Sequence, residues 1–221
     1  MHRVSTNRKY FTERYDAAKQ LFDELPTNYF DSNDTVVLAL SEGGTIIADS
    51  MARMLECDMD ILLSESILAP NNKELPIARV SETQQIVVHR ALVDSFDIDD
   101  EYIYQEAKRV YDKDILSYLY KYRHGTHIRF VKGKSVILVD ECIETDLTAL
   151  VAIKTAISLG ARSVYIAAPI MDSSAYDSLM QVGDGLFCPH QIRDYISVEY
   201  YYDSLEKPEF EDIERILKKY E

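Results

Sequence analysis

The strongest candidates for chemistry are two adjacent carboxylates, Asp140 and Glu141, which directly follow the apolar run 135–139. A short apolar run rich in β-branched residues is typical of a strand that is buried on both faces. In open parallel sheets, ligands bind beyond the carboxyl ends of the strands. The two acids, called the acidic pair below, are therefore predicted to face a ligand. The alternative is a solvated strand end at which Asp140 caps a turn.

A turn rich in threonine and carboxylates follows the acidic pair and leads into a predicted helix over 148–159. The turn consists of Glu144, Thr145, Asp146, Leu147 and Thr148. Hydroxyl groups at the start of a helix accept hydrogen bonds from its first backbone N–H groups. Thr145 and Thr148 are therefore predicted to be turn and helix-cap residues.

Two adjacent glycines, Gly43 and Gly44, follow a second apolar run and open a predicted helix that extends to about residue 55. Glycine allows a tight turn and a close approach of the backbone to a ligand. A Gly-Gly pair also fits a strand-to-helix turn that is only structural, so both interpretations stay open.

Apolar segments alternate with helical patterns along the chain. Strands are predicted over 35–40, 59–63, 135–139 and 163–168, with short strands at 85–89 and 185–188. Helices are predicted over 8–25, 43–55, 99–122, 148–159, 173–181 and 209–220. This alternation indicates an α/β fold with a mainly parallel central sheet and helices on both faces. Ser41, Ser64 and Asp140 should then lie at one edge of the sheet.

Composition narrows the class of protein further. A length of 221 residues, 47% of them apolar, fits one α/β domain over 1–221. The net charge of −14 repels phosphate backbones and anionic lipids, so neither a nucleic acid nor a membrane is expected as a partner. No apolar run approaches the roughly 18 residues that span a bilayer. Residues 1–10 lack a signal-peptide core, and the three cysteines form no CxxC pair, which predicts a cytoplasmic protein with reduced thiols.

The segment 136–148 resembles the substrate-binding loop of phosphoribosyltransferases. That loop has an apolar strand, two acidic residues, three variable residues, Thr-Gly, one variable residue and Thr. The resemblance extends over nearly the whole chain. The further matching residues are Phe11, Arg14, Asp16, Ala17, Leu38, Ala39, Leu40, Gly43, Gly44, Ala48, Pro70, Asn72, Glu74, Leu75, Ile77, Val80, Glu82, Tyr122, Arg123, Tyr201, Tyr202 and Asp203.

The resemblance implies the phosphoribosyltransferase fold and an enzyme of that type. Such an enzyme moves a 5-phosphoribosyl group from phosphoribosyl pyrophosphate, with Mg²⁺, to a nitrogenous acceptor. It implies that the acidic pair, Asp140 and Glu141, is catalytic, holds the ribose hydroxyls and is the candidate for binding Mg²⁺, although no third metal ligand is identifiable. The substrate contacts that it implies are Glu42, Gly43, Gly44, Glu144, Thr145, Asp146, Leu147 and Thr148.

The resemblance also divides the single domain and suggests its partners. Residues 66–130 correspond to a flexible segment and a long helix, and residues 185–221 correspond to a hood strand and a C-terminal helix. Around the Thr-Gly-x-Thr turn, the family cradles the 5′-phosphate of its substrate at a helix start, where free N–H groups and a partial positive charge favour an anion. The expected partner is a small-molecule ligand, and a homodimer is an open alternative.

Several loop residues depart from the family pattern toward negative charge. Glu42 stands where the family has a basic residue, Glu65 and Ser66 stand where it has Arg-Lys, and Asp146 stands where it has glycine. A carboxylate about 4 Å from a phosphate charge costs on the order of 4 kcal/mol at an effective dielectric of 20, roughly a thousandfold in affinity. Binding of phosphoribosyl pyrophosphate should therefore be weak.

Two smaller departures flank the acidic pair. Cys142 replaces a glycine, and Glu144 replaces a small residue. Acids beside Cys142 should raise the pKa of its thiol, so a reactive nucleophile is not predicted.

Three functions follow from these observations. The first is a phosphoribosyltransferase whose activity is weakened or lost. The second is a non-catalytic regulatory or scaffold protein that retains the fold. The third, a Mg²⁺-dependent phosphatase or receiver-like domain, leaves Gly43-Gly44 and the matches at 70–82 unexplained.

Overall fold

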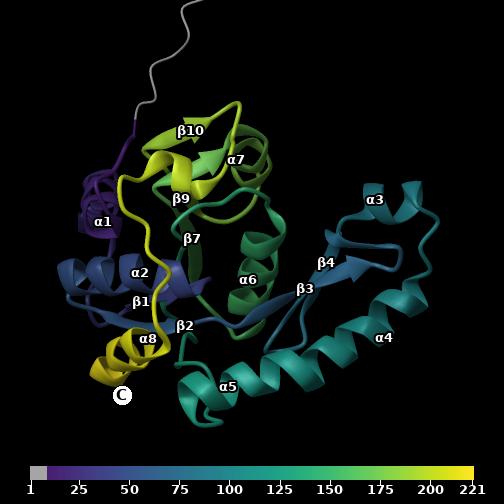
Figure 1. Ribbon diagram of the computed structural model, residues 1–221. Helices are drawn as coiled ribbons and strands as arrows, with labels where there is room; N and C mark the ends of the chain where they lie inside the picture. The colour runs from purple at the N-terminus through teal and green to yellow at the C-terminus, as the bar shows by residue number, and fades with distance from the viewer. Residues whose placement is uncertain (1–8) are drawn as a thin grey trace, which may run out of the picture.

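The computed structural model describes residues 9–221 and centres on a sheet of five parallel strands (Figure 1). The strands lie in the order β2 (Asp58–Ile61), β1 (Thr35–Ala39), β6 (Ser135–Val139), β7 (Ser163–Ala167) and β9 (Gly185–Phe187). Every neighbouring pair is parallel. The predicted mainly parallel α/β sheet is therefore confirmed.

Helices cover both faces of this sheet, as the alternating pattern predicted. One face is covered by α1 (Arg14–Asp23) and α2 (Glu42–Leu55), and α8 (Phe210–Leu217) packs beside α2. The other face is covered by α6 (Leu147–Ser158) and α7 (Ser173–Leu179). This arrangement leaves the carboxyl ends of β1, β2 and β6 open toward the loops that the sequence singled out.

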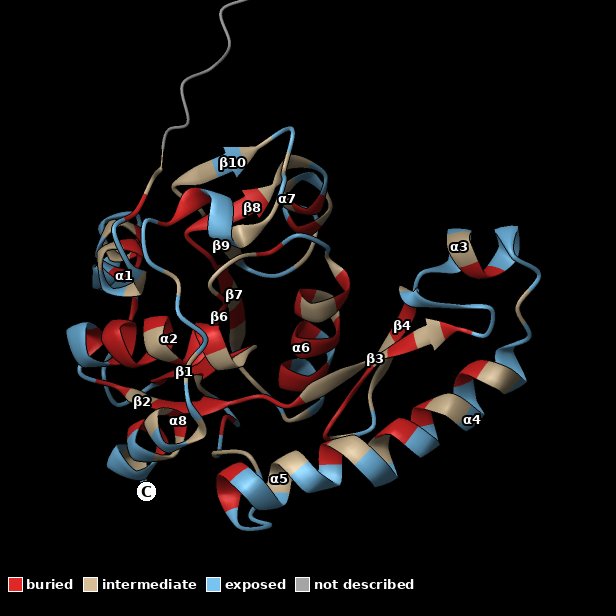
Figure 2. Cartoon of the chain, in the orientation of Figure 1, coloured by how far each residue is buried: buried red, intermediate tan, exposed pale blue. Residues whose placement is uncertain are grey.

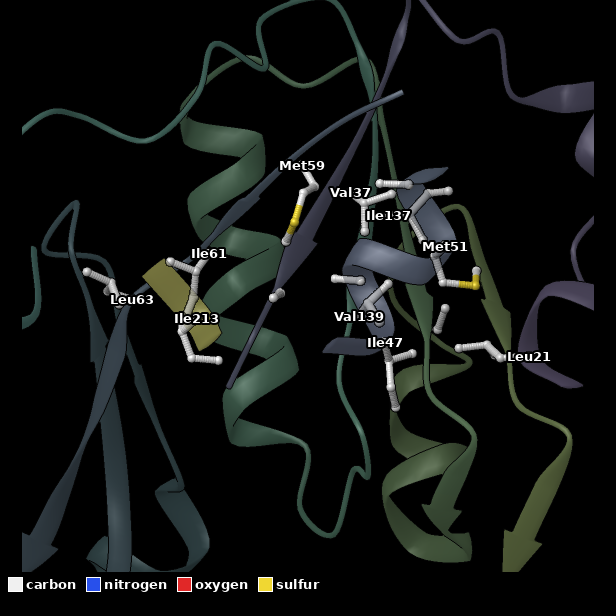
Figure 3. Close-up of a cluster of buried hydrophobic side chains, with 14 of the residues drawn as sticks. Leu21, Val37, Ile47, Met51, Met59, Ile61, Leu63, Ile137, Val139 and Ile213 are labelled. Atoms are coloured by element: carbon white, nitrogen blue, oxygen red, sulfur yellow. The ribbon is translucent and has the colours of Figure 1, made fainter. Parts of the chain in front are cut away.

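The sheet forms because its strands are apolar on both sides. All residues of β1 and β6 are buried (Figure 2), and successive side chains point to opposite faces. Val37 and Ile137 join Ile47 and Met51 of α2 in one cluster (Figure 3), whereas Val136 packs on the α6 side. Each such fully buried side chain stabilises the fold by about 1.5–3 kcal/mol.

The first helix begins later than the sequence pattern predicted. The predicted helix over 8–25 is α1, which starts at Arg14, and residue 8 lies outside the described residues. Phe11 instead pairs with Tyr202 in a β-bridge, and its carbonyl accepts a hydrogen bond from the Asp203 N–H at 2.9 Å. The chain before α1 is thus extended and attached to the C-terminal part of the molecule.

Residues 64–123 form an arm beside the sheet, called the hairpin arm below (Figure 1). Its antiparallel sheet contains β3 (Ser64–Ala69), β4 (Asn72–Ser81) and β5 (Ile86–Val88). Its helices are α3 (Arg90–Ser95), α4 (Asp100–Val110) and α5 (Leu116–Arg123), with one π-helical turn at Tyr111–Ile115 between the last two. The pattern predicted the helix over 99–122 and the strand at 85–89. It predicted neither β3 nor β4, because the first half of β4 is exposed and lacks alternation.

A second small sheet pairs β8 (Ile170–Asp172) with β10 (His190–Ile192) in parallel. The sequence pattern predicted neither of these two strands. The segment after β10 contains a 3₁₀ turn at Val198–Tyr201 and leads to α8. Within residues 9–221, no helix combines the length and apolar character needed to cross a bilayer.

Candidate functional site

The acidic pair lies at the carboxyl end of β6, next to the end of β1. Because the two strands run in register, Ala39 lies opposite Val139, and the residues that follow meet. The Ser41 hydroxyl donates a hydrogen bond of 2.5 Å to Asp140 Oδ1, which also accepts the Glu141 N–H at 2.8 Å. The prediction that Ser41 and Asp140 share one edge of the sheet is confirmed, and Ser64 follows β2 at this edge as the first residue of β3.

Asp140 is only 7% exposed, and this burial dominates its acidity. Burial raises the pKa of Asp140 to about 7, and the charge of Glu141 raises it too, whereas the Ser41 hydrogen bond and the charge of Arg79 oppose the rise. The carboxyl group therefore exchanges its proton near neutral pH. A ligand that donates hydrogen bonds to it would favour the ionised form.

Glu141 is turned away from solvent toward α1 and α2. Arg14 Nε donates a hydrogen bond of 2.7 Å to Glu141 Oε2, and the two side chains are 10% and 19% exposed. A Cβ added to Gly43 would lie 2.2 Å from the carboxyl carbon of Glu141. While Glu141 keeps this position, its carboxylate occupies the space that a side chain at residue 43 would need.

Glu42 and Gly44 complete this part of the site at the N-terminus of α2. Ser41 caps the helix by accepting the Gly44 N–H at 2.9 Å. The Glu42 carboxylate accepts a hydrogen bond from the Tyr122 hydroxyl and lies 3.8 Å from Lys207 Nζ. A cavity of about 390 Å³, called the α2 cavity below, lies between this helix start and the C-terminal segment. Its charged lining residues are Arg14, Glu42, Glu141, Glu199 and Lys207.

The turn 144–148 lies at a different cavity. Helix α6 begins at Leu147, and Asp146 is its N-cap residue, although the Asp146 side chain makes no capping hydrogen bond within the described part of the chain. Asp146 Oδ2 instead accepts a hydrogen bond of 2.6 Å from the Ser178 hydroxyl of α7. The prediction that Thr148 caps the helix is wrong: the backbone begins the helix at Leu147, and Thr148 lies inside its first turn.

The second cavity, called the α6 cavity below, has a volume of about 380 Å³. Residues 144–147 form one wall, and Leu75, Pro76, His89 and Leu92 of the hairpin arm form another. Glu144 and Thr145 are exposed there. The structure thus divides the predicted contacts into one group around the α2 cavity and another group at the α6 cavity.

Comparison with known proteins decides the family. Residues 7–203 match the phosphoribosyl transferase domain. The chain belongs to the phosphoribosyl transferase domain family. The resemblance read from the sequence is therefore confirmed, and so is the fold that it implied.

Two Mycobacterium tuberculosis proteins, from strains CDC 1551 and H37Rv, are named as candidate phosphoribosyl transferases, and each is 27% identical to this chain over 162 residues. The aligned region is 73% of this chain but 36% of theirs, so the chain spans about a third of the length of these relatives. The crystal structure of TT1426 from Thermus thermophilus superposes with a TM-score of 0.78 and 26% identity. That match covers 95% of this chain and 98% of TT1426.

In this phosphoribosyl transferase domain, Arg79 is a further candidate site residue, which the sequence pattern did not identify, and its charge acts on Asp140. Its guanidinium donates hydrogen bonds to the Ser64 and Ser66 hydroxyls at 2.8 and 2.9 Å. Arg79 lies directly opposite Ser66 across the β3–β4 hairpin. The cation expected at the Glu65-Ser66 positions therefore comes from the neighbouring strand, and its charge opposes the burial that raises the pKa of Glu65. The register of the β3–β4 hairpin would have identified Arg79, but the sequence pattern did not predict this hairpin.

The acidic pair does not by itself fit a protein-held magnesium ion. Among residues 9–221, no group of three or more His, Cys, Asp or Glu side chains could hold a metal. Asp140 Oδ1 and Glu141 Oε2 are already engaged by Ser41 and Arg14. Hard divalent cations require about six oxygen ligands, and these two carboxylates supply too few.

Cys142 is expected to be unreactive in the folded protein. Its Sγ lies 3.3 Å from the Tyr195 hydroxyl, and burial, with the charges of Asp140, Glu144 and Glu141, raises its pKa to about 12. Because the thiolate is the reacting species, alkylation by iodoacetamide at pH 8 should be slow, and unfolding in guanidinium should accelerate it by about 100-fold or more. Mass spectrometry of alkylated peptides measures both rates. Rapid labelling of native Cys142 would contradict the described burial.

Proposed function

We propose that this chain binds a 5-phosphoribosyl ligand through its phosphate and ribose, and that transfer from phosphoribosyl pyrophosphate is weakened or lost in it. Family membership supports the reaction class. The assignment of subsites starts from the family pattern: the turn 144–148 for the 5′-phosphate and, of the acidic pair, Asp140 for the ribose hydroxyls, because Arg14 already holds the Glu141 carboxylate.

The phosphate end of the proposed site is supported by the start of α6. The Asp146 carboxylate is held by Ser178, so it does not cap the first N–H groups of the helix. These groups lie at the α6 cavity, where residues 144–147 line the wall. A helix start with free N–H groups favours an anion. Asp146 therefore harms phosphate binding less than the sequence alone suggested.

The observation that carries the loss of transfer is the position of Glu141. Its carboxylate lies against Gly43 in the α2 cavity, and Arg14 holds it there at 2.7 Å. By resemblance, Gly43 and Gly44 match the pyrophosphate loop of the family, so this is the expected place of the pyrophosphate. A pyrophosphate would enter beside this carboxylate and that of Glu42. Repulsion of about 4 kcal/mol at 4 Å in an effective dielectric of 20 opposes such binding.

Magnesium, when bound with the ligand, would neutralise developing charge on the departing pyrophosphate. In this chain the groups that would share that task at the α2 cavity are Arg14 and Lys207, and each of them already lies beside a carboxylate. The position of Glu141 in the α2 cavity also favours a second candidate function, a non-catalytic regulatory protein that senses a ribose phosphate.

Calorimetric titration with ribose 5-phosphate tests the proposal. The wild-type protein is expected to bind it, with an affinity that decreases as salt is added. Glu144→Gln removes an exposed carboxylate from the α6 cavity and should strengthen binding by about 2- to 5-fold, the effect of a unit charge at several ångströms in water. Glu211→Gln, an exposed acid of α8 on the other face of the sheet, is the matched control and should leave the affinity unchanged. Absence of binding to folded wild-type protein at millimolar concentration would refute the proposal.

A further inference from the structure

We propose that Arg14 is an anion-binding residue of the α2 cavity that Glu141 keeps closed, so that the two side chains act as a latch. In the closed form, the Glu141 carboxylate occupies the place of a ligand phosphate. In the open form, Glu141 leaves Gly43, and the guanidinium of Arg14 pairs with the incoming pyrophosphate. This inference rests on the proposed function for the identity of the ligand, but its test needs pyrophosphate alone.

The latch is built from contacts that fix Arg14 on two sides. Arg14 Nε donates to Glu141 Oε2 at 2.7 Å, and Arg14 Nη1 donates to the Glu206 carbonyl at 2.7 Å. The Arg14 side chain is only 10% exposed, yet it lines the α2 cavity. A buried guanidinium is stable only when it is paired and hydrogen-bonded. Of the two acceptors of Arg14, Glu141 is the charged one, and the Glu206 carbonyl is neutral.

The backbone around Arg14 keeps the guanidinium in place when Glu141 moves. Arg14 is the first residue of α1, and the chain just before it is attached to the C-terminal segment. The Asp203 N–H donates to the Phe11 carbonyl at 2.9 Å, and the Ser204 N–H donates to the Thr12 carbonyl at 3.0 Å. Arg14 is thus presented by a fixed scaffold. The Glu141 backbone is held by Asp140 and by the Tyr202 hydroxyl, which donates to the Glu141 carbonyl at 3.2 Å, whereas the Glu141 carboxylate is held by its ion pair with Arg14.

The chemistry of the cavity favours an exchange of anions. A carboxylate and a phosphate oxygen make the same kind of charge-assisted hydrogen bond to a guanidinium, and arginine binds either of them with paired donors. Gly43 presents no side chain, so the space vacated by Glu141 adjoins both the N-terminus of α2 and Arg14. Both features favour an anion there.

The charges that line the α2 cavity explain why the position of Glu141 determines whether an anion can bind there. The lining of the α2 cavity carries the cations Arg14 and Lys207 and the anions Glu42, Glu141 and Glu199. With Glu141 inside, the anions outnumber the cations. When Glu141 leaves, one repelling charge is removed and the Arg14 guanidinium loses its carboxylate partner, so it can pair with a pyrophosphate.

Isothermal titration with sodium pyrophosphate at low ionic strength tests the latch in four proteins. Glu141→Ala should bind pyrophosphate at least about tenfold more tightly than wild type, because Arg14 gains a charged hydrogen-bond partner. Glu199→Ala is the matched control, since it removes an equal charge from the same cavity without releasing Arg14, and its gain should stay below about 3-fold. The double variant Arg14→Gln/Glu141→Ala should lose the gain.

Three results would overturn the proposal. They are no gain in a Glu141→Ala protein that unfolds cooperatively like wild type, equal gains in Glu141→Ala and Glu199→Ala, and a gain that persists in the double variant. None of these depends on ribose 5-phosphate. If the wild type fails to bind ribose 5-phosphate while Glu141→Ala gains pyrophosphate affinity, the proposed function falls and the latch stands.

Discussion

Replacement of Glu82 by alanine is expected to lower the free energy of unfolding by about 3–5 kcal/mol, the cost of leaving a buried charge without its partner. Glu82 is 8% exposed, accepts the Leu63 N–H at 2.9 Å and receives a hydrogen bond from Arg123 Nη2. Arg123 is 6% exposed, and Asp60 is its other acidic neighbour, at 3.6 Å. The substitution would therefore leave a guanidinium in the interior with a single, more distant carboxylate.

Urea unfolding at pH 7, followed by circular dichroism, measures this loss. Glu106→Ala is the control, because Glu106 also pairs with an arginine, but that partner, Arg109, is 54% exposed. Surface pairs of this kind contribute about 0–1 kcal/mol. Equal losses in the two variants would show that the Glu82–Arg123 pair is not the buried, mutually dependent ion pair described here.

The second large effect concerns Asp140, which is held in a state that costs stability. Burial raises its pKa from an ordinary value of 3.8 to about 7. Asp140→Asn keeps an oxygen that can accept from Ser41 and from the Glu141 N–H. At pH 8 the variant should be more stable than wild type by up to about 4 kcal/mol, since each pKa unit corresponds to about 1.4 kcal/mol. The same variant should weaken ribose 5-phosphate binding by about tenfold or more, because the charged acceptor is lost.

The sign of the pH dependence follows from linkage. Because the folded-state pKa of Asp140 lies above its unfolded value, the contribution to stability is present below about pH 4 and is lost as the pH rises toward 7. The advantage of Asp140→Asn should therefore be small at pH 4, grow up to pH 7 and stay constant above it. Unfolding curves at several pH values measure the difference. A difference that does not change with pH would contradict the described burial of the carboxyl group.

The sequence predicted the parts of the fold that depend on local pattern. Continuous apolar runs such as 135–139 identified the central strands, because strands that are covered on both faces have no polar side. Because the run 135–139 was identified as a strand, the acidic pair that follows it was placed correctly at the carboxyl edge of the sheet. β3 and β4 were missed, since the exposed start of β4 has no periodic signal and its partner strand begins at Ser64, right after the apolar run predicted as the strand 59–63.

What the sequence could not predict is the direction of the acidic side chains. The Glu42 carboxylate accepts a hydrogen bond from the Tyr122 hydroxyl, and the Asp146 carboxylate accepts one from the Ser178 hydroxyl. These contacts join residues 80 and 32 positions apart in the chain, so no local spacing reveals them. Arg14 likewise reaches Glu141 across 127 positions. Family resemblance marked Arg14 as a match, and only the fold shows that Arg14 pairs with Glu141 at the α2 cavity.

The central claim is that the ribose-phosphate end of the site is retained while the pyrophosphate end is closed by Glu141. A parallel calorimetric titration of the wild-type protein with ribose 5-phosphate and with phosphoribosyl pyrophosphate plus Mg²⁺ tests it most directly. The account predicts that the pyrophosphate adds no affinity, so that ribose 5-phosphate binds at least as tightly. If phosphoribosyl pyrophosphate bound about tenfold more tightly than ribose 5-phosphate, a gain of about 1.4 kcal/mol, the α2 cavity would be open to it and the account would be contradicted.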